Sequence, residues 1–180
     1  MPSPLIEEIH TPRLVLIPMT PESIQAEQNA NGNFHQLGAT IHCTVHPEWP
    51  PIDWEPHVLT FILDQFAAHP DQIGWHRYVA LLEPDGTRTL IGGLGAFSKE
   101  DPPGTCEIGY AILPSFEGKG YATEGTQAHI RSLRADTRIS SIIAHTFPTL
   151  PRSIRVMEKC GLVFDGDGDE PGTIRYRLRL

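Results

Sequence analysis

A glycine pair, Gly118 and Gly120, gives the clearest chemical signal in this sequence. The surrounding stretch, 106–125, has the pattern of a strand, a glycine turn and the start of a helix. Glycines one residue apart allow positive φ angles and a close approach to a ligand, and the first amides of a helix point outward without partners. Such a turn suits phosphate oxygens, because these amides converge with the positive end of the helix dipole. The competing interpretation is an ordinary strand-to-helix connection, since Gly-x-Gly alone is a weak signal.

Two other kinds of site receive little support from residue spacing. A Walker-type nucleotide loop requires Ser or Thr after its lysine, whereas Lys119 is followed by Gly120 and Tyr121. The run 42–46 contains two histidines and Cys43, but no second ligand pair at zinc-type spacing follows. We therefore expect neither a nucleotide-phosphate enzyme nor a bound metal ion.

Composition limits the class of protein. The 180 residues fit a single domain, 1–180, that can bury a sizeable core. Acidic residues outnumber basic ones 22 to 14, for a net charge of −8, so we expect no nucleic-acid partner. Three widely spaced cysteines indicate a reducing compartment without a disulfide framework. No apolar run approaches the roughly 20 residues of a membrane helix, and no signal-peptide pattern is present. The expectation is a cytoplasmic protein without membrane association.

The elements that would position the glycine turn alternate between strands and helices. Strands are expected over 14–17, 75–82, 89–97, 107–113, 139–147, 162–164 and 174–180, and helices over 21–28, 55–68, 122–135 and 153–160. This order predicts an α+β (mixed α/β) fold with a largely antiparallel sheet. Gly92, Gly93 and Gly95 inside one strand indicate a bulge or a close backbone approach. On the helix 55–68, His57 and Gln65 are expected to face solvent or the preceding loop.

The segment 34–53 is irregular and rich in histidine and proline. A loop of this length in a compact domain is usually functional or mobile. One interpretation is a surface loop with a hydrophobic underside. The other is a lid over a substrate pocket, with Trp49 and Trp54 as its walls.

Four stretches together resemble the GNAT family of N-acetyltransferases, and most closely its RimJ/RimL-type branch of ribosomal-protein N-terminal acetyltransferases. They are TPRLVL (11–16), CEIGY (106–110), GKGYATE (118–124) and SIRVMEKCGL (153–162), in family-like order and spacing. The resemblance implies a GNAT acyl-CoA N-acyltransferase fold: one twisted, mostly antiparallel sheet of about seven strands, splayed at the central strand, with helices on both faces. It also implies acetyl-CoA as cosubstrate and direct transfer to a primary amine of a protein N-terminus, an amino acid or a small amine.

The resemblance assigns the donor site to the glycine turn and to the main chain of the central strand. Backbone amides of the turn would bind the CoA pyrophosphate; the matching residues are Glu117, Gly118, Lys119, Gly120, Tyr121, Ala122 and Thr123. A bulge in the central strand would bring the main chain of Ile112 and Leu113 to the pantetheine arm and the thioester carbonyl. Ser115 replaces the arginine or glutamine that often opens this motif.

The same resemblance suggests an acid and a base, which the transfer needs for the leaving thiolate and the attacking amine. Glu107 stands where histone acetyltransferases carry a general base, and a structural carboxylate is the alternative. The other candidates for the base are His145 and the acidic residues near the last hairpin, Asp165, Asp167, Asp169 and Glu170. Ser153 aligns with a serine near the CoA sulfur that acts as hydrogen-bond donor or acid, although a helix N-cap would also explain it.

Two further residues depart from the family pattern. Leu150 replaces an asparagine that contacts pantetheine in many relatives, and Met157 replaces a tyrosine acid. Neither side chain transfers protons, so any acid is Ser153, water or nothing. The alternative to a working acetyltransferase is therefore a catalytically weak acyl-CoA-binding module of the same fold. The acceptor's identity stays open, as does the choice between a monomer and a homodimer.

Overall fold

The structure is a computed structural model that describes residues 6–52, 54, 56–100 and 102–180. Seven strands in this part of the chain have five residues or more, and two have only two residues. They are β1 (Ile9–His10), β2 (Leu14–Pro18), β3 (Thr44–Val45), β4 (Arg77–Leu82), β5 (Arg88–Lys99), β6 (Thr105–Ile112), β7 (Ser141–Thr146), β8 (Val163–Asp167) and β9 (Ile174–Arg179). The helices are α1 (Pro21–Gln28), α2 (His35–Ile41), α3 (Pro56–Ala68), α4 (Tyr121–Leu133) and α5 (Pro151–Lys159), with 3-10 turns η2 (Pro70–Gln72) and η3 (Pro114–Phe116).

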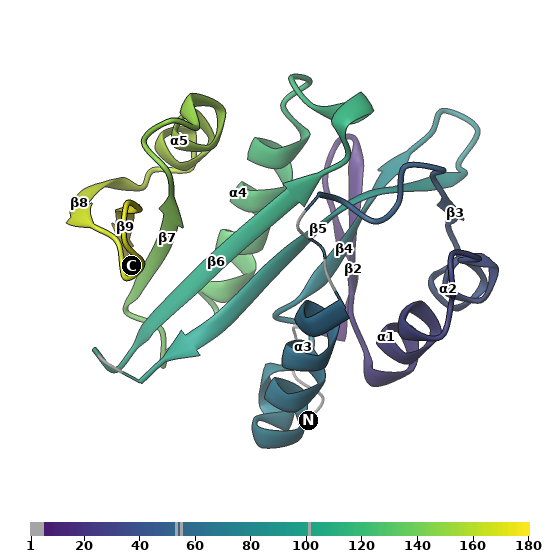
Figure 1. Ribbon diagram of the computed structural model, residues 1–180, viewed down its shortest axis with the longest axis horizontal. Coiled ribbons are helices and arrows are strands. Elements are labelled where there is room, and N and C mark those ends of the chain that lie inside the picture. The colour runs from purple at the N-terminus through teal and green to yellow at the C-terminus, as the bar shows by residue number, and fades with distance from the viewer. Residues whose placement is uncertain (1–5, 53, 55, 101) are drawn as a thin grey trace.

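The strands form one open sheet in the order β1-β2-β4-β5-β6-β7-β9-β8, and β3 pairs with β5 (Figure 1). Among the described residues, six of the eight strand pairings are antiparallel, while β3–β5 and β6–β7 are parallel. This topology confirms the mixed α/β fold with a mostly antiparallel sheet that the element order predicts. No helix in the described ranges is long and apolar enough to cross a membrane.

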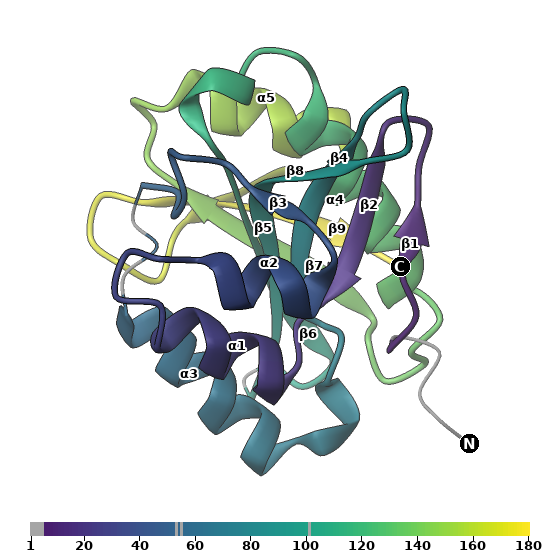
Figure 2. The ribbon, with the colours of Figure 1, turned by 90° about the vertical axis from the view of Figure 1, so that its right-hand side faces the viewer.

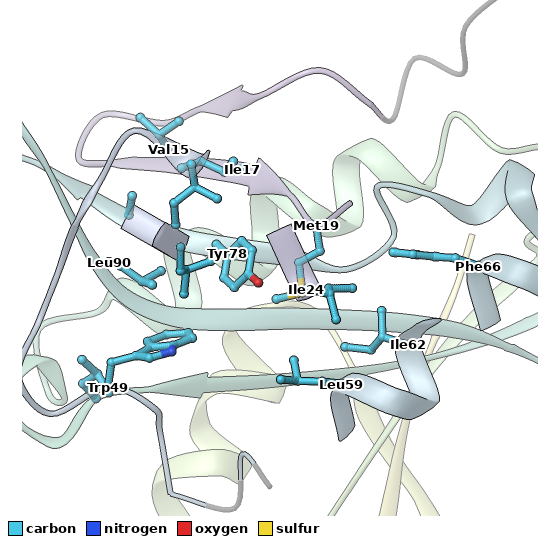
Figure 3. Packing of buried hydrophobic residues seen from close by; sticks show 14 residues of the cluster. Val15, Ile17, Met19, Ile24, Trp49, Leu59, Ile62, Phe66, Tyr78 and Leu90 are labelled. Atoms are coloured by element: carbon cyan, nitrogen blue, oxygen red, sulfur yellow. The ribbon is translucent and has the colours of Figure 1, made fainter. Parts of the chain in front are cut away.

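Helices cover both faces of the sheet, as Figures 1 and 2 show from two directions. Side chains alternate along β2, so that Val15 and Ile17 face α1, α2 and α3, whereas Leu14 and Leu16 face α4. The hydrophobic core between the sheet and α1, α2 and α3 is shown in Figure 3, where Trp49 and Tyr78 pack among aliphatic side chains from the sheet and the helices. The second face is closed by α4 and α5, which pack on β6 and β7 around Met157.

The segment 34–53 is more regular than the sequence predicts. It contains α2, whose Leu37 and Ile41 are buried against the sheet, and the short strand β3. This helix has only seven residues and no side-chain cap at Phe34, so it lacks the signals that mark a helix in sequence. Asp53, at the end of the segment, and Glu55, the first residue of the predicted helix 55–68, lie outside the described residues.

Two local predictions are wrong. Gln65 is buried, and its amide donates to Gln72 Oε1 at 2.7 Å and to the Ala96 carbonyl at 3.2 Å. A polar side chain under the helix is stable there because its hydrogen bonds are satisfied. The bulge predicted in the central strand β6 is absent from its ladder with β5, whereas the bulge predicted near Gly92 is present, because the pairing of β5 with β4 skips Ile91. The ladder between β5 and β6 runs to Ile112 without a register shift.

Candidate active site

The strands β6 and β7 start side by side and then separate, as Figure 1 shows. Their parallel ladder joins 105–107 to 141–143, whereas β6 continues to Ile112. The splay predicted from the family resemblance is therefore present, and it opens directly after Glu107. A strand edge that leaves its neighbour offers backbone N–H and C=O groups to an extended ligand.

Ile112 and Leu113 are expected to contact the donor through their main chain, but their main-chain groups are not equally free to bind a ligand. Ile112 is partly exposed and pairs with Gly92 at the end of the ladder. Leu113 is fully buried; its N–H donates to the Ile91 carbonyl at 2.8 Å, and its carbonyl accepts from Phe116 N–H at 2.9 Å. Leu113 therefore shapes the end of the strand, and the free edge that precedes it is the better candidate for ligand contacts.

The glycine turn has the backbone geometry expected of an anion site. Gly118 and Gly120 have φ angles of 74° and 83°, in the left-handed region that favours glycine. Gly120 is the N-cap of α4, and the first intrahelical bond runs from Glu124 N–H to its carbonyl at 3.0 Å. The amides of Tyr121, Ala122 and Thr123 precede that bond. They therefore point out of the helix start toward the exposed turn.

Residues far from the turn in sequence brace it. Glu124, in the first turn of α4, accepts hydrogen bonds from Thr11 Oγ1 at 2.7 Å, Arg13 N–H at 3.0 Å and Arg13 Nε at 2.7 Å. Arg13 also donates to the Lys119 carbonyl at 3.0 Å and lies 4.6 Å from the centre of the Tyr121 ring. Burial alone would raise the pKa of Glu124, but these bonds outweigh it and hold the pKa below its usual value. Two of the four family-like stretches thus meet in a clamp that fixes the turn.

The other side of the turn is tied to α5 and to the segment before α3. Arg152 Nη1 lies 2.8 Å from Glu117 Oε2. The carboxylate of Glu48 accepts from the hydroxyl of Ser115 and, at 3.2 Å, from its N–H. Ser115, which replaces a long polar side chain of the family pattern, therefore anchors a segment from the opposite side of the sheet.

A cavity of about 480 Å³ lies at the splay. Its polar lining comes from β5, β6, β7, α5 and the β8–β9 turn, and aromatic and aliphatic side chains complete it: Phe97, Lys99, Glu107, His145, Thr146, Phe147, Leu150, Ser153, Asp169, Glu170 and Thr173. Alternation along β6 turns Ile108 and Tyr110 toward α4 and α5, and Glu107 toward the opposite face. Because Ser153 belongs to α5, the cavity reaches through the splay from one face of the sheet to the other.

Ser153 faces a tyrosine that the sequence reasoning missed. Its hydroxyl lies 3.1 Å from the hydroxyl of Tyr110, which also donates to the Ser153 carbonyl at 3.0 Å. The N-cap of α5 is Leu150, and Ser153 is the third helical residue, so the N-cap interpretation of Ser153 is wrong. Burial raises the pKa of Tyr110 to about 12. The sequence did carry a signal for Tyr110. In the strand CEIGY (106–110), side chains alternate between the two faces of the sheet, so Tyr110 and Glu107 point to opposite faces.

Three of the candidate bases meet on the other face. Glu107 Oε1 lies 2.8 Å from His145 Nδ1, and Asp169 Oδ1 lies 3.6 Å from His145 Nε2. Lys99 Nζ stands between the two carboxylates, 3.2 Å from Glu107 Oε2 and 3.0 Å from Asp169 Oδ2. The hydrogen bond from Lys99 is the main reason that the pKa of Asp169 lies below its usual value.

Of the remaining acidic residues of the hairpin, Glu170 lines the cavity, whereas Asp165 and Asp167 do not. Asp165 pairs with Arg177 at 2.7 Å and Arg175 at 2.9 Å, and the bond from Arg177 is the main cause of its lowered pKa. Asp167 ends β8, and Glu170 lines the cavity. The structure thus brings Asp169 and Glu170 to the site and keeps Asp165 in an ion-pair cluster beside it.

The two tryptophans share one buried partner, Glu27. Trp49 Nε1 and Trp54 Nε1 donate to its carboxylate at 2.9 and 3.0 Å, and Tyr78 donates at 2.7 Å. Burial raises the pKa of Glu27, and these three donors partly offset that effect. Trp49 is only 4% exposed and packs in the core (Figure 3). It does not line the cavity at the splay, but it does line a second cavity, of about 830 Å³, together with residues of α2 and β3. Trp54 is partly exposed and covers Gly93, where an added Cβ would lie 2.9 Å from its ring.

Comparisons with known proteins agree with this geometry. Residues 13–163 match the family model of the acetyltransferase (GNAT) domain. The chain is 36% identical over 77 residues to the uncharacterized N-acetyltransferase YnaD of Bacillus subtilis (strain 168), a match that covers 43% of this chain and 45% of YnaD. It therefore spans less than half of that relative.

Two solved structures have the same fold. An acetyltransferase from Agrobacterium tumefaciens str. C58 superposes with a TM-score of 0.64 at 20% identity, over 97% of this chain and 95% of that one. The RimL ribosomal L7/L12 alpha-N-protein acetyltransferase in complex with coenzyme A superposes with a TM-score of 0.61 at 16% identity, over 97% and 98%. At these identities the likeness concerns the fold alone.

Proposed function

Because the chain belongs to the GNAT family of acetyltransferases, we propose that it transfers an acetyl group from acetyl-CoA to a primary amine at the cavity between β6 and β7. The family match over residues 13–163 covers most of the chain. Membership in the family supports acetyl-CoA as the donor. The RimJ/RimL-type branch and the kind of amine are part of the proposal, and the acceptor is a protein N-terminus, an amino acid or a small amine.

The glycine turn is the observation that carries the donor assignment. Its positive φ angles at Gly118 and Gly120 and the outward amides up to Thr123 form a cradle for two phosphoryl groups. The residues of this cradle are Glu117, Gly118, Lys119, Gly120, Tyr121, Ala122 and Thr123, and they act through their main chain. Because Glu117 N–H already donates to the Pro114 carbonyl at 3.2 Å, the amides from Gly118 onward are the better candidates for phosphate contacts. From there the pantetheine arm follows the free edge of β6 near Ile112 into the splay, which ends at the cavity.

The cavity holds groups for both proton transfers. The amine nitrogen forms a bond to the acetyl carbon while its proton passes to a base, and the carbon–sulfur bond breaks. The base belongs to the cluster of Glu107, His145 and Asp169 on one face. On the other face, the hydroxyl pair of Tyr110 and Ser153 gives a proton to the CoA thiolate. Tyr110 thereby supplies the phenol that Met157 cannot.

The charge and shape of the cavity favour a cationic amine. Its described lining contains three carboxylates, Glu107, Asp169 and Glu170, against one ammonium, Lys99. Gly109, between Glu107 and Ala111 on the same face, is exposed, and an added Cβ there would meet no other group of the described residues. We place the approach of the acceptor to the cavity over this open glycine, beside Glu107.

Release of free thiol from acetyl-CoA, measured over amino acids, a polyamine and peptides with free N-termini, tests the proposal. We expect amine-dependent release with at least one acceptor, and an acetylated product of the matching mass. Calorimetry with acetyl-CoA in parallel separates the alternatives. Binding without turnover on any amine would favour the catalytically weak acyl-CoA-binding module, and an absence of binding would refute the donor site.

A further inference from the structure

The imidazole of His145 has one nitrogen that is hydrogen-bonded and one that makes no hydrogen bond to the described residues. Nδ1 lies 2.8 Å from Glu107 Oε1. Nε2 is shielded from solvent and has no hydrogen-bond partner among the described residues, and Asp169 Oδ1 stands 3.6 Å away. A buried polar atom without a partner is unfavourable, so its presence beside the cavity suggests a functional reason.

Glu107, the first choice for the base from sequence, has both of its oxygens occupied. Oε1 pairs with His145 and Oε2 with Lys99. A carboxylate only accepts hydrogen bonds, so the proton between Glu107 and His145 belongs to Nδ1. In this tautomer a neutral imidazole carries its lone pair on Nε2, the atom that makes no hydrogen bond to the described residues.

We propose that His145 is the catalytic base of the transfer and that Glu107 is a positioning residue, which orients the ring and stabilises the imidazolium. The inference rests on the proposed acetyl transfer. An acceptor that enters as an ammonium first gives one proton to Nε2 of His145, which frees the nitrogen lone pair to bond to the acetyl carbon. The second proton that the nitrogen loses then passes to water. The carbon–sulfur bond then breaks, and the thiolate takes a proton from the pair of Tyr110 and Ser153. Exchange with water afterwards returns both groups to their starting protonation.

Charged groups from four parts of the fold surround the ring. They are Glu107 on β6, Lys99 on β5, Asp169 and Glu170 on the β8–β9 turn, and Arg175 on β9, whose Nη1 lies 3.6 Å from Asp169 Oδ1. Lys99 is shared by Glu107 and Asp169, so one ammonium balances two carboxylates. The side chain of Asp169 is 47% exposed, which lets an incoming ammonium meet this carboxylate beside Nε2.

The dependence of kcat on pH in two variants distinguishes His145 from Glu107 as the base. If His145 is the base, His145→Gln lowers kcat by about 100-fold or more and abolishes the acid limb of the profile. Glu107→Gln then lowers kcat less and retains an acid limb, because the base itself is still present. The reverse pattern, with the limb lost in Glu107→Gln and retained in His145→Gln, would overturn the inference. If His145→Gln does not fold, the pH profile of Glu107→Gln alone still distinguishes the two residues as the base.

Rescue and a matched control separate a chemical role from a structural one. Imidazole added to His145→Ala should restore part of the rate in proportion to its concentration, whereas a rate that does not respond to imidazole argues against a base at this position. His69→Gln removes an exposed histidine that does not line the cavity and should keep the wild-type profile. The affinity of each variant for acetyl-CoA, by calorimetry, should stay within about twofold of wild type.

A metal ion is the remaining alternative for this cluster, since ligand atoms of Glu107, His145 and Asp169 lie within 4.8 Å of one another. Lys99 stands between the two carboxylates and supplies the positive charge that an ion would bring. We expect EDTA to leave the rate unchanged; loss with EDTA and recovery with Zn²⁺ would overturn the assignment of the base. If wild-type protein releases no thiol with any amine, the proposed function fails, which these tests distinguish from failure of the His145 assignment.

Discussion

Gly118→Asp separates binding of the donor from folding of the turn. Gly118 has a φ angle of 74°, and an added Cβ would meet no atom of the described residues within 4 Å. A non-glycine residue in this conformation costs about 1–2 kcal/mol, which lowers Tm by about 2–8 °C in a chain of this length. Gly86, in the β4–β5 hairpin, has a φ angle of 85° and equally open surroundings. Gly86→Asp therefore carries the same strain and charge away from the proposed site.

The effect on the donor follows from electrostatics. A carboxylate about 4 Å from each of two phosphoryl charges, in a water-like dielectric, is repelled by about 2 kcal/mol in total. This corresponds to an increase of about 30-fold in the Kd for acetyl-CoA. Gly120→Asp would be less informative, because its added Cβ lies 3.4 Å from Arg13 Nη2, whose charge would compensate the carboxylate.

Calorimetry with acetyl-CoA, on both variants at low salt, is the assay. We expect Gly118→Asp to weaken binding by about 30-fold and Gly86→Asp to leave it unchanged, while Tm falls by a similar amount in both. Equal affinities in the two variants would refute the placement of the pyrophosphate on this turn.

Three further predictions concern the thiol side, the acceptor path and stability. Tyr110→Phe removes the partner of the Ser153 hydroxyl and should lower kcat by about 10–100-fold without changing the Kd for acetyl-CoA; an unchanged kcat would contradict a role for the phenol in protonating the thiolate. Gly109→Val fills the exposed floor beside Glu107 and should raise the KM for the amine several-fold, so an unaltered KM would place the acceptor elsewhere. Burial lowers the pKa of His129 to about 3, so the folded protein keeps this side chain neutral where an unfolded histidine binds a proton, below about pH 6.5. The free energy of unfolding should therefore decrease as the pH is lowered, and His129 should account for about 2 kcal/mol of that decrease at pH 5. Urea unfolding at pH 5 and 7.5 should show a correspondingly smaller decrease in His129→Leu. The same decrease in both proteins would contradict this prediction.

Local signals predict much of the fold. The glycines at Gly118 and Gly120 predict a turn with positive φ, which the structure confirms. The β4–β5 hairpin uses residues typical of turns, since Asp85 Oδ1 accepts from Thr87 N–H at 2.9 Å and Gly86 has a positive φ. Just beyond α5, Gly161 also has a positive φ, as is common for glycine after a helix. In each case the conformation depends on a few neighbouring residues, so sequence alone is sufficient.

The contacts that build the site depend on distant pairings. Glu107 meets His145 only because β6 and β7 lie parallel, and nothing in either strand specifies that neighbour. Arg13 and Glu124 are 111 positions apart and meet because α4 crosses the face of β2. Glu27 illustrates the same limit, since an acidic residue on a polar helix gives no sign that two tryptophans and a tyrosine will enclose its carboxylate.

The amide resonances of the glycine turn test the central claim most directly. Acetyl-CoA and acetyl-pantetheine share the thioester and the pantetheine arm, but only acetyl-CoA carries the pyrophosphate. Titration followed by ¹⁵N NMR should therefore shift the amides of Gly118, Gly120 and Tyr121 with acetyl-CoA and leave them nearly unchanged with acetyl-pantetheine, while residues on the free edge of β6 respond to both. Shifts confined to other regions, or identical shifts of the turn with both ligands, would contradict the account.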